Sequence, residues 1–272
     1  MTKLIGEIGI NHQSDYKTLI KLSDMVLDSG FDYIKIQLRT PRLCVPRDQW
    51  DKPREWFDGT PMTYIQYKER IELNDEQFDM WMKRYAGKAF ASVWDIPSLG
   101  KLAKYNPPYI KIPSALLTND SLINTAMDTG IPIILSTGMS TIEEIDHAVN
   151  LFSSTYDLVM MHCTSTYPVA DEEINLRVMK TLRDRYMIPV GYSSHDKSPF
   201  SSLYAMALGA WGIENHVTLD RSMKGTDHSS SLEKPALELI ARERGRINII
   251  MGDGIKRLYD SELSSRNKLR GS

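Results

Sequence analysis

The sequence has few cysteines and no long apolar run, and both absences narrow the class of protein. Two cysteines, Cys44 and Cys163, cannot build the disulfide framework of a small secreted domain. Cys163 lies within an apolar run, which favours a buried free thiol in a reducing compartment. No stretch of about 18 apolar residues occurs, and the N-terminus lacks the apolar core of a secretory signal. We therefore expect a cytoplasmic protein without a transmembrane helix.

The sequence also lacks an excess of charge of either sign. Lysine and arginine number 33 and aspartate and glutamate 35, so the formal net charge is −2. Proteins that bind nucleic acids usually carry a basic excess or stripe, and here the basic residues are scattered. We expect no nucleic-acid partner and no membrane partner. The 272 residues, 42% of them hydrophobic, are ordinary for a soluble globular protein.

Eight short apolar runs alternate with segments of helical periodicity along the chain. The eight predicted strands are 4–10, 33–39, 89–94, 109–114, 132–137, 157–163, 189–194 and 212–217. Cap residues support the helices between them, with Asp15 predicted to begin the first and Ser140 or Thr141 the fifth. Eight such units predict an α/β fold, a (β/α)8 TIM barrel with a single domain over residues 1–272. A doubly wound sheet is the alternative, and the count and even spacing of the strands favour the barrel.

The segment 40–72, after the second strand, breaks this regularity. Its first part is rich in proline, tryptophan and charged residues. A long irregular loop within a compact domain is usually functional or disordered. We expect it to lie over the barrel mouth as a lid or substrate loop, and a mobile surface insertion is the alternative.

Polar residues stand at the C-terminal end of every predicted strand, where this kind of barrel builds its site. The strand-end residues are Glu7, Asn11, His12, Lys35, Gln37, Arg39, Ser92, Asp95, Lys111, Ser114, Ser136, Thr137, His162, Thr164, Ser193, Ser194, His195, Glu214 and His216. A single one could be a satisfied core residue. Together they must meet each other, water or a ligand, because an unpaired buried charge costs several kcal/mol.

The mixture of residue types indicates the ligand. Lys35 and Lys111 lie near several hydroxyls, and the turn 136–141 precedes a helix, which suits a phosphate or carboxylate. A plain capped turn is the simpler interpretation of 136–141. His195 and His216 end adjacent strands and could share a divalent metal ion, or each could simply be a hydrogen-bonded histidine.

At these residues the sequence resembles the sialic acid synthase family, of the NeuB type, which uses phosphoenolpyruvate. The matching segments are EIGINH (7–12), KIQ (35–37), KIPS (111–114), ILSTGMST (134–141), MHCTSTYP (161–168), GYSSH (191–195) and ENHVTLDRSMKGTD (214–227). They occur in order and span almost the whole chain.

The resemblance implies that phosphoenolpyruvate condenses with an aldose of the N-acylmannosamine type and that phosphate is released. It implies a divalent cation, Mn²⁺ or Mg²⁺, that polarises the aldehyde. The implied metal ligands are His195 and His216. The implied catalytic residues are Glu7, Lys35, Lys111 and Asp227, and the implied substrate-binding residues are Gln37, Ser114, Ser136, Tyr167 and Ser193.

Three departures from the family pattern stand out. The chain ends at Ser272, before the C-terminal antifreeze-like domain that many family members carry, so sugar recognition and the expected homodimer could differ. Leu116 stands where an acidic residue is usual, and Ser165 where an asparagine is usual. We therefore expect the phosphoenolpyruvate half of the site to be retained and the sugar half to be altered.

Two other functions compete with the synthase. A class I aldolase would form a Schiff base on Lys35 or Lys111. A non-catalytic barrel would bind an acidic metabolite without reacting, and the pair His195 and His216 argues against this.

Overall fold

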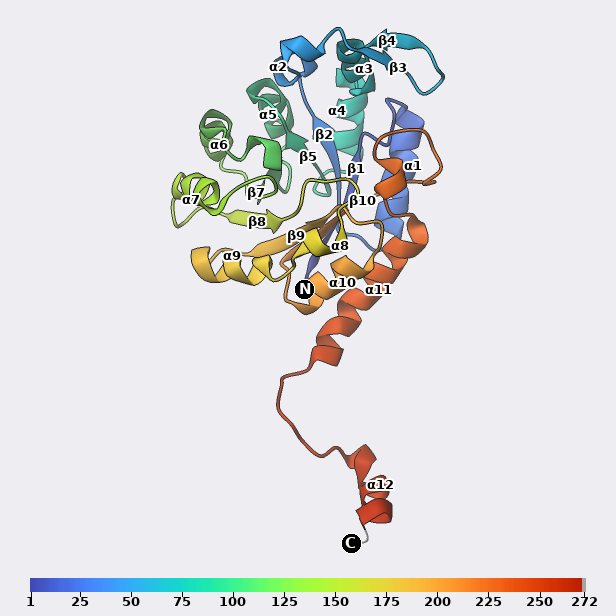
Figure 1. Cartoon of the computed structure of the whole chain (residues 1–272), viewed down its shortest axis with the longest axis vertical. Coiled ribbons are helices and arrows are strands. Elements are labelled where there is room, and N and C mark those ends of the chain that lie inside the picture. Colours follow the sequence, from blue (N-terminus) through green and yellow to red (C-terminus); the bar gives the residue numbers. More distant parts are fainter. Residues whose placement is uncertain (271–272) are drawn as a thin grey trace.

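The structure, a computed structural model, describes residues 1–270 and shows a closed barrel of eight parallel strands (Figure 1). The barrel strands are β1 (Lys3–Gly9), β2 (Tyr33–Leu38), β5 (Ala89–Val93), β6 (Ile110–Ile112), β7 (Ile133–Ser136), β8 (Leu158–His162), β9 (Val190–Ser194) and β10 (Gly212–His216). The barrel closes where β1 pairs with β10. The predicted TIM barrel is confirmed, and the doubly wound sheet is excluded.

Each strand turns alternate side chains toward the barrel interior and toward the helices. Ile5, Phe90, Ile134, Val159 and Met161 form a small buried cluster inside the barrel. A much larger buried cluster lies between the strands and the surrounding helices. The barrel interior is therefore apolar toward the N-terminal ends of the strands. Polar side chains that point inward occupy only the C-terminal end of the interior.

The helices that surround the barrel are α1 (Tyr16–Asp28), α4 (Asp75–Arg84), α5 (Ile96–Ala103), α6 (Asp120–Met127), α7 (Ile142–Asn150), α9 (Val178–Tyr186), α10 (Phe200–Ala207) and α11 (Lys234–Met251). Asp15 begins α1 by accepting hydrogen bonds from two backbone N–H groups, as predicted. Thr141, not Ser140, begins α7 and forms a capping box with Glu144. Gly6 allows α1 to approach β1, because a Cβ atom there would lie 2.5 Å from the Val26 side chain.

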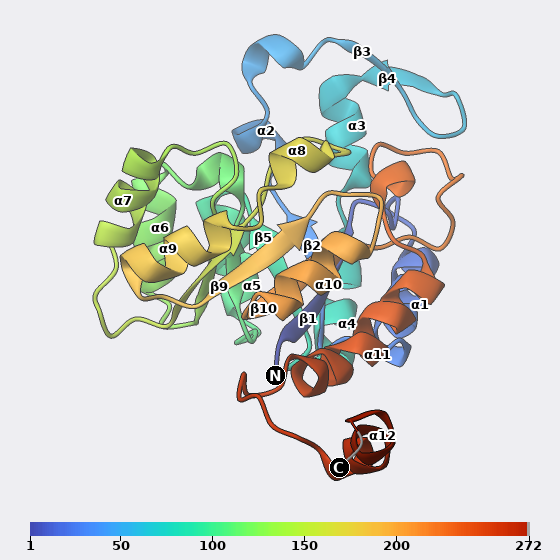
Figure 2. The same cartoon turned by 60° about the horizontal axis from the view of Figure 1, so that its bottom comes forward.

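The segment after β2 is an ordered insertion and not a long loop. It contains α2 (Pro41–Cys44), a 3-10 helix (Arg47–Gln49), the hairpin β3 (Pro53–Glu55) and β4 (Pro61–Thr63), and α3 (Tyr64–Ile71). Figure 2 shows the insertion at the same end of the barrel as α8 (Asp171–Ile174) and the loop after β10. The irregular conformation expected for this segment was wrong, and a position over the barrel mouth and movement as a lid stay predictions.

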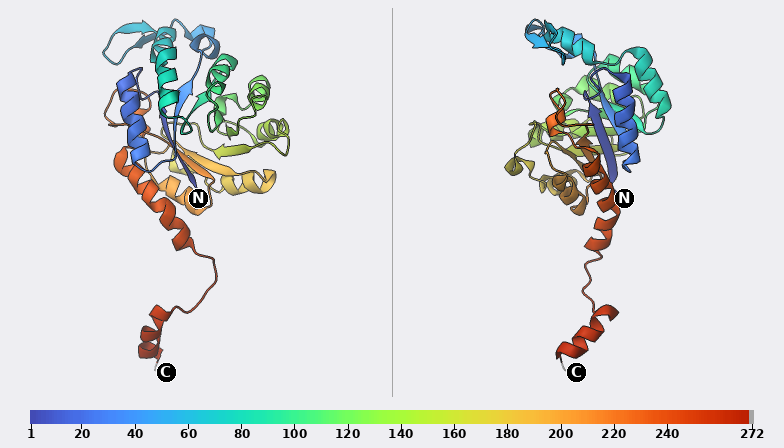
Figure 3. Two further views of the ribbon diagram at one scale, coloured as in Figure 1. Left: turned by 180° about the vertical axis from the view of Figure 1, so that it is seen from behind. Right: turned by 90° about the vertical axis from the view of Figure 1, so that its right-hand side faces the viewer.

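The chain leaves the barrel after α11. Residues beyond Met251 lead to α12 (Asp260–Arg270), which lies well apart from the barrel in both views of Figure 3. No helix within residues 1–270 is both long enough and apolar enough to cross a membrane.

Candidate active site

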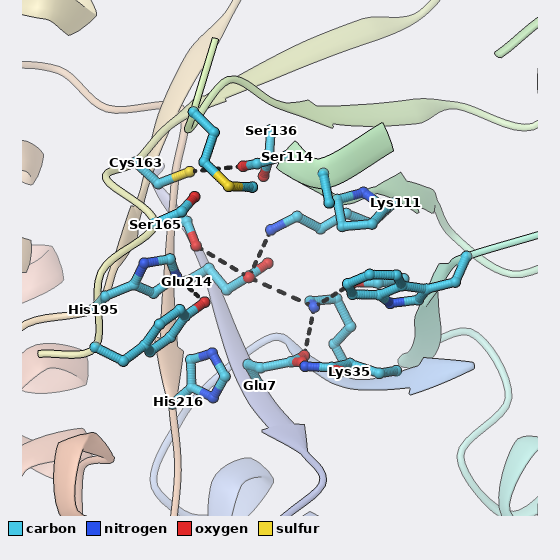
Figure 4. A pocket seen from close by; sticks show the side chains of 18 residues that line it. Glu7, Lys35, Lys111, Ser114, Ser136, Cys163, Ser165, His195, Glu214 and His216 are labelled. Carbon is cyan, nitrogen blue, oxygen red and sulfur yellow. Dashed lines mark hydrogen bonds and ion pairs between the residues drawn. The ribbon is translucent and has the colours of Figure 1, made fainter. Parts of the chain in front are cut away.

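A cavity of about 200 Å³ opens at the C-terminal ends of the barrel strands. Ten of the eleven predicted site residues line this central cavity. They are Glu7, Lys35, Gln37, Lys111, Ser114, Ser136, Tyr167, Ser193, His195 and His216. Because these residues come from strands spread around the whole barrel, closing the barrel is what brings them together (Figure 4).

Two lysines and two carboxylates form a buried ion network on the cavity floor. Lys35 Nζ lies 2.5 Å from Glu7 Oε2 and 3.5 Å from Glu214 Oε1. Lys111 Nζ lies 2.6 Å from the same Glu214 oxygen, to which Ser193 also donates at 3.2 Å. One glutamate in β10 therefore contacts lysines from β2 and β6, and Glu214 and Glu7 together balance their two charges.

The network sets the protonation of its members. Burial alone would raise the pKa of Glu214, but Lys111 and Lys35 outweigh burial and lower it to about 2. Burial would lower the pKa of Lys35, but Glu214 and Glu7 outweigh burial and raise it. For Lys111 burial dominates over the attraction of Glu214, so its pKa is lowered. Glu214 is thus ionised, and Lys111 is the lysine whose charge is least stabilised.

Hydroxyl and backbone donors line the wall beside Lys111. Ser136 Oγ is buried and has no hydrogen-bond partner within the described residues. Ser114 Oγ accepts a hydrogen bond from the N–H of Gly138 at 3.0 Å. Gly138 permits this packing, because a Cβ atom there would lie 2.3 Å from Ser165 Oγ. In the turn 136–141 Ser136 lines the cavity and Thr141 caps α7, and binding of a phosphate or carboxylate by this turn stays a prediction.

The two histidines lie side by side at the opposite wall from the lysines (Figure 4). Their ring centroids are 5.8 Å apart. His195 Nδ1 donates to the carbonyl of Thr164 at 2.6 Å, so Nε2 carries the lone pair and accepts from the Tyr167 hydroxyl at 2.8 Å. Burial, together with His216, lowers the pKa of His195 to about 3, so the imidazole is neutral.

The two histidines are suited to bind a divalent cation, but they supply only two protein ligands for it. His195 has the neutral imidazole that metal binding needs, and its Thr164 contact fixes the ring. His216 Nδ1 is buried without a hydrogen-bond partner in the part of the chain that the structure describes. No group of three or more His, Cys, Asp or Glu residues within 1–270 is arranged to hold a metal. Water and substrate oxygens would have to complete the coordination.

Asp227 is the predicted site residue that does not line the central cavity. It stands at the rim, where its Oδ2 lies 3.7 Å from His216 Nδ1. Residues 212–216 form a fully buried strand, and the loop that follows is held in part by distant side chains, since Gln13 donates to the Lys224 carbonyl. His228 in that loop is buried against Thr218, at 2.7 Å, and is structural.

Other polar strand ends have structural roles. Asn11 donates to the Val217 carbonyl, Asp95 begins α5, and the His162 ring contacts the Ile174 carbonyl. Conversely, the sequence analysis named Glu214 as a strand-end residue but assigned it no role in the site, although it lies two residues before His216 on the same face of β10. Ser92 was also without a role, and it accepts a hydrogen bond from Lys35 at 2.7 Å.

A sequence model of the NeuB family matches residues 22–256, which is more than half of the chain. The chain belongs to the NeuB family. This confirms the resemblance drawn from the strand-end segments, and it makes the chain an enzyme of the synthase type.

NeuB relatives match over almost the whole chain. An N,N'-diacetyllegionaminic acid synthase from Campylobacter jejuni is 32% identical over 100% of this chain and 84% of its own length. The human N-acetylneuraminate-9-phosphate synthase is 29% identical over 98% of this chain and 76% of its own length.

Solved structures agree with this assignment. The N-acetylneuraminic acid synthetase of Leptospira borgpetersenii, crystallised with citrate, superposes with a TM-score of 0.85 at 29% identity, covering 100% of this chain and 93% of that chain. A truncated 3-deoxy-D-arabino-heptulosonate 7-phosphate synthase of Thermotoga maritima, at a TM-score of 0.64 and 16% identity, shares the fold.

Proposed function

We propose that this NeuB-family chain joins phosphoenolpyruvate to an N-acylmannosamine-type aldose, forming a sialic acid-like nonulosonic acid and inorganic phosphate. The observation that carries the proposal is the central cavity itself, which sets two buried lysines and the unpaired hydroxyl of Ser136 opposite two imidazole rings. The names of the legionaminic and neuraminate-9-phosphate synthases support the same product class.

Phosphoenolpyruvate would bind against the lysine wall. Lys111 makes one hydrogen bond, to Glu214, so two of its N–H donors remain for substrate oxygens. Ser136 supplies a further buried donor, and Ser114 and Ser193 also line the cavity. Charged hydrogen bonds of this kind are short and strong in a buried site, which suits a phosphate and a carboxylate held together.

The reaction balances without a redox step. C3 of phosphoenolpyruvate forms a bond to the aldehyde carbon, and the aldehyde oxygen gains a proton. A water oxygen adds at C2 and loses one proton, which balances the proton gained by the aldehyde oxygen. The bond from C2 to the phosphate oxygen then breaks, phosphate leaves with the electron pair and takes up the second water proton, and C2 becomes a ketone carbon. Glu7, held by Lys35 beside the His216 ring, is the carboxylate we assign to take the water proton.

His195 and His216 would hold the divalent cation, Mn²⁺ or Mg²⁺. When bound, such an ion polarises an aldehyde oxygen as a Lewis acid. The hydroxyl of Tyr167 contacts His195, and although the side chain is half-exposed, its partial burial raises the pKa of Tyr167, so the hydroxyl keeps its proton. Its hydroxyl is therefore a donor available to the sugar once His195 binds the ion. Gln37 and Asp227 are the other groups that we assign to the sugar.

The test is phosphate release from phosphoenolpyruvate with Mn²⁺ and a panel of N-acylmannosamines and other aldoses. We expect release that requires an aldose and that a chelator abolishes, with Lys111→Met inactive and the surface variant Lys88→Gln unaffected. Release without a sugar, or activity in the presence of chelator, would contradict the proposal. Borohydride trapping with a keto acid checks the aldolase alternative, in which a covalent adduct on Lys111 would form.

A further inference from the structure

The loop 217–231 after β10, which carries Asp227, lies against the loop between β1 and α1 (Figure 1). We call it the Asp227 loop. Asn11 Nδ2 donates to Ser231 Oγ at 2.9 Å, and Ser231 Oγ donates to the Asp227 carbonyl at 2.7 Å. A side chain from the loop after β1 is thus connected to the backbone of Asp227 through a single hydroxyl.

Gln13 makes a second connection to this loop, which we call the Gln13 bridge. Its Nε2 atom donates to the Lys224 carbonyl and lies 3.0 Å from His228 Nε2. A carbonyl only accepts, so the Gln13 atom is the amide nitrogen, and it donates to His228 as well. The His228 tautomer is thereby fixed, since Nε2 accepts from Gln13 and Nδ1 donates to Thr218 Oγ1 at 2.7 Å. The bridge therefore holds the Asp227 loop on both sides of Asp227.

The His228 ring accepts this hydrogen bond because it is neutral. The ring is buried, and burial lowers the pKa of His228 against the opposing effect of Asp227 and Asp220. Gly225 lets the loop pack closely on the ring, because a Cβ atom there would lie 2.6 Å from His228 Cδ2. Close packing and two hydrogen bonds therefore hold the His228 ring in place.

The backbone at Gln13 adopts a conformation that most side chains avoid. Its φ is 51° and that of Ser14 is 62°, so two successive residues that are not glycine lie in the left-handed region. Such strain persists only where the surrounding structure determines it, and it is concentrated at functional sites. The strained turn directs the Gln13 amide to the Asp227 loop, as a positioning contact requires.

We propose that Gln13 is a positioning residue for the sugar half of the reaction, because it fixes the loop that carries Asp227. The Asp227 carboxylate lies 3.7 Å from His216 Nδ1 at the rim of the central cavity, so a small shift of the loop changes what the sugar meets. The inference rests on the proposed function, which assigns Asp227 to the sugar. Gln13 is absent from the described residues that line the central cavity, so it would act on the sugar through Asp227 alone.

Phosphate release from phosphoenolpyruvate, with Mn²⁺ and N-acetylmannosamine as the aldose, tests this role. Gln13→Met keeps the length of the side chain and removes its N–H donors. We expect it to raise the KM for the aldose about ten-fold, because the loop loses two hydrogen bonds, and to change the KM for phosphoenolpyruvate by less than about two-fold. Gly225→Ala, which would displace the His228 ring, should raise the same KM selectively.

A double-mutant cycle separates positioning from a general loss of stability. If Gln13 acts through Asp227, Gln13→Met should raise the aldose KM by less than about two-fold in an Asp227→Asn background. A ten-fold effect in both backgrounds, or equal effects on both substrates, would overturn the proposal and leave the synthase intact. Gln77→Met is the matched control. It removes a side-chain hydrogen bond at the start of α4 and should leave both KM values unchanged.

Hydrogen exchange measured without substrates separates this inference from the proposed function. The N–H groups of Met223 and Ser230 donate to carbonyls within the Asp227 loop. They should exchange at least about five-fold faster in Gln13→Met, while the barrel helices keep their wild-type rates. If no aldose reacts, the synthase fails, but faster exchange confined to the loop would still support Gln13 as the residue that places Asp227. Unchanged exchange in Gln13→Met would overturn the inference, whatever the activity.

Discussion

Glu214 is the residue on which the central cavity depends most, because one carboxylate oxygen contacts both buried lysines. Lys35 has a second partner in Glu7, but Lys111 has no other carboxylate within 4.0 Å among the described residues. Removing one member of a buried ion pair usually costs more than the pair itself contributes, since the other charge is left without compensation.

We therefore predict that Glu214→Gln lowers the free energy of unfolding by about 3–5 kcal/mol, measured by urea denaturation. The same variant should lose phosphate release, because Lys111 is no longer held. Glu238→Gln is the matched control. Glu238 pairs with Lys234 on the surface at 3.8 Å, so its loss should cost no more than about 0.5 kcal/mol. Equal stability of the two variants would refute the central role of Glu214.

Sequence reasoning succeeded for residues on strands and was weaker for residues on loops. Residues two apart on a strand face the same way, so placing His216 in the cavity also places Glu214 there. That rule was available from the sequence and was not applied to Glu214. Asp227 belongs to a loop whose path depends on contacts far away in the chain, and no periodicity predicts its distance from His216.

Whole elements were predictable where the apolar pattern was strong. Seven of the eight barrel strands lie within the predicted runs and β1 begins one residue before its run, because a strand covered on the outside by helices needs apolar residues there. The hairpin of β3 and β4 was not predicted, because it lacks the apolar pattern of the barrel strands. Its strands are three residues long and β3 is fully exposed, so no buried face leaves a pattern in the sequence.

The capping box at the start of α7 should contribute measurably to the stability of the protein. Thr141 and Glu144 satisfy each other's backbone N–H groups there, directly after the turn that carries Ser136. Thr141→Ala should reduce the free energy of unfolding by about 1 kcal/mol. Thr125→Ala, within the exposed face of α6, is the control and should change it by less than about 0.5 kcal/mol. Thermal or urea unfolding that does not separate the two variants would contradict the capping box.

The whole molecule consists of a barrel and a segment that stands apart from it. Residues 252–270 are exposed throughout, and apart from the Gly252 N–H, which donates to the Asn248 carbonyl at the end of α11, they hydrogen-bond only among themselves. A chain that stops at Met251 should therefore unfold at the same urea concentration as the full chain. A loss of stability that depends on protein concentration would instead show that this segment joins subunits, as the predicted homodimer would require.

Acid should destabilise the whole fold through His12. Burial, reinforced by Arg39 and opposed by Asp15, lowers the pKa of His12 to about 4. The unfolded chain takes up a proton near pH 6.5 while the folded chain does not, so stability is complete above pH 6.5 and declines as the pH falls toward 4. The decline should reach about 3 kcal/mol.

The variant His12→Asn should lose this contribution and show a shallower fall in urea-unfolding free energy between pH 6.5 and 4. His147→Asn replaces an exposed histidine on α7 and should keep the wild-type slope. Identical slopes for His12→Asn and the wild type would show that His12 titrates normally in the folded protein.

The shared carboxylate of Glu214 also has a consequence for how the chain folds. Lys35 in β2 and Lys111 in β6 precede Glu214 in the sequence. Glu214 belongs to β10, the last barrel strand to be synthesised. A barrel without β10 would carry Lys111 in its interior with no counter-charge, at a cost of several kcal/mol. Partial barrels are thereby disfavoured, and the closing strand supplies both the last hydrogen bonds and the last charge. Folding of the barrel is for this reason expected to be all-or-none, with no stable half.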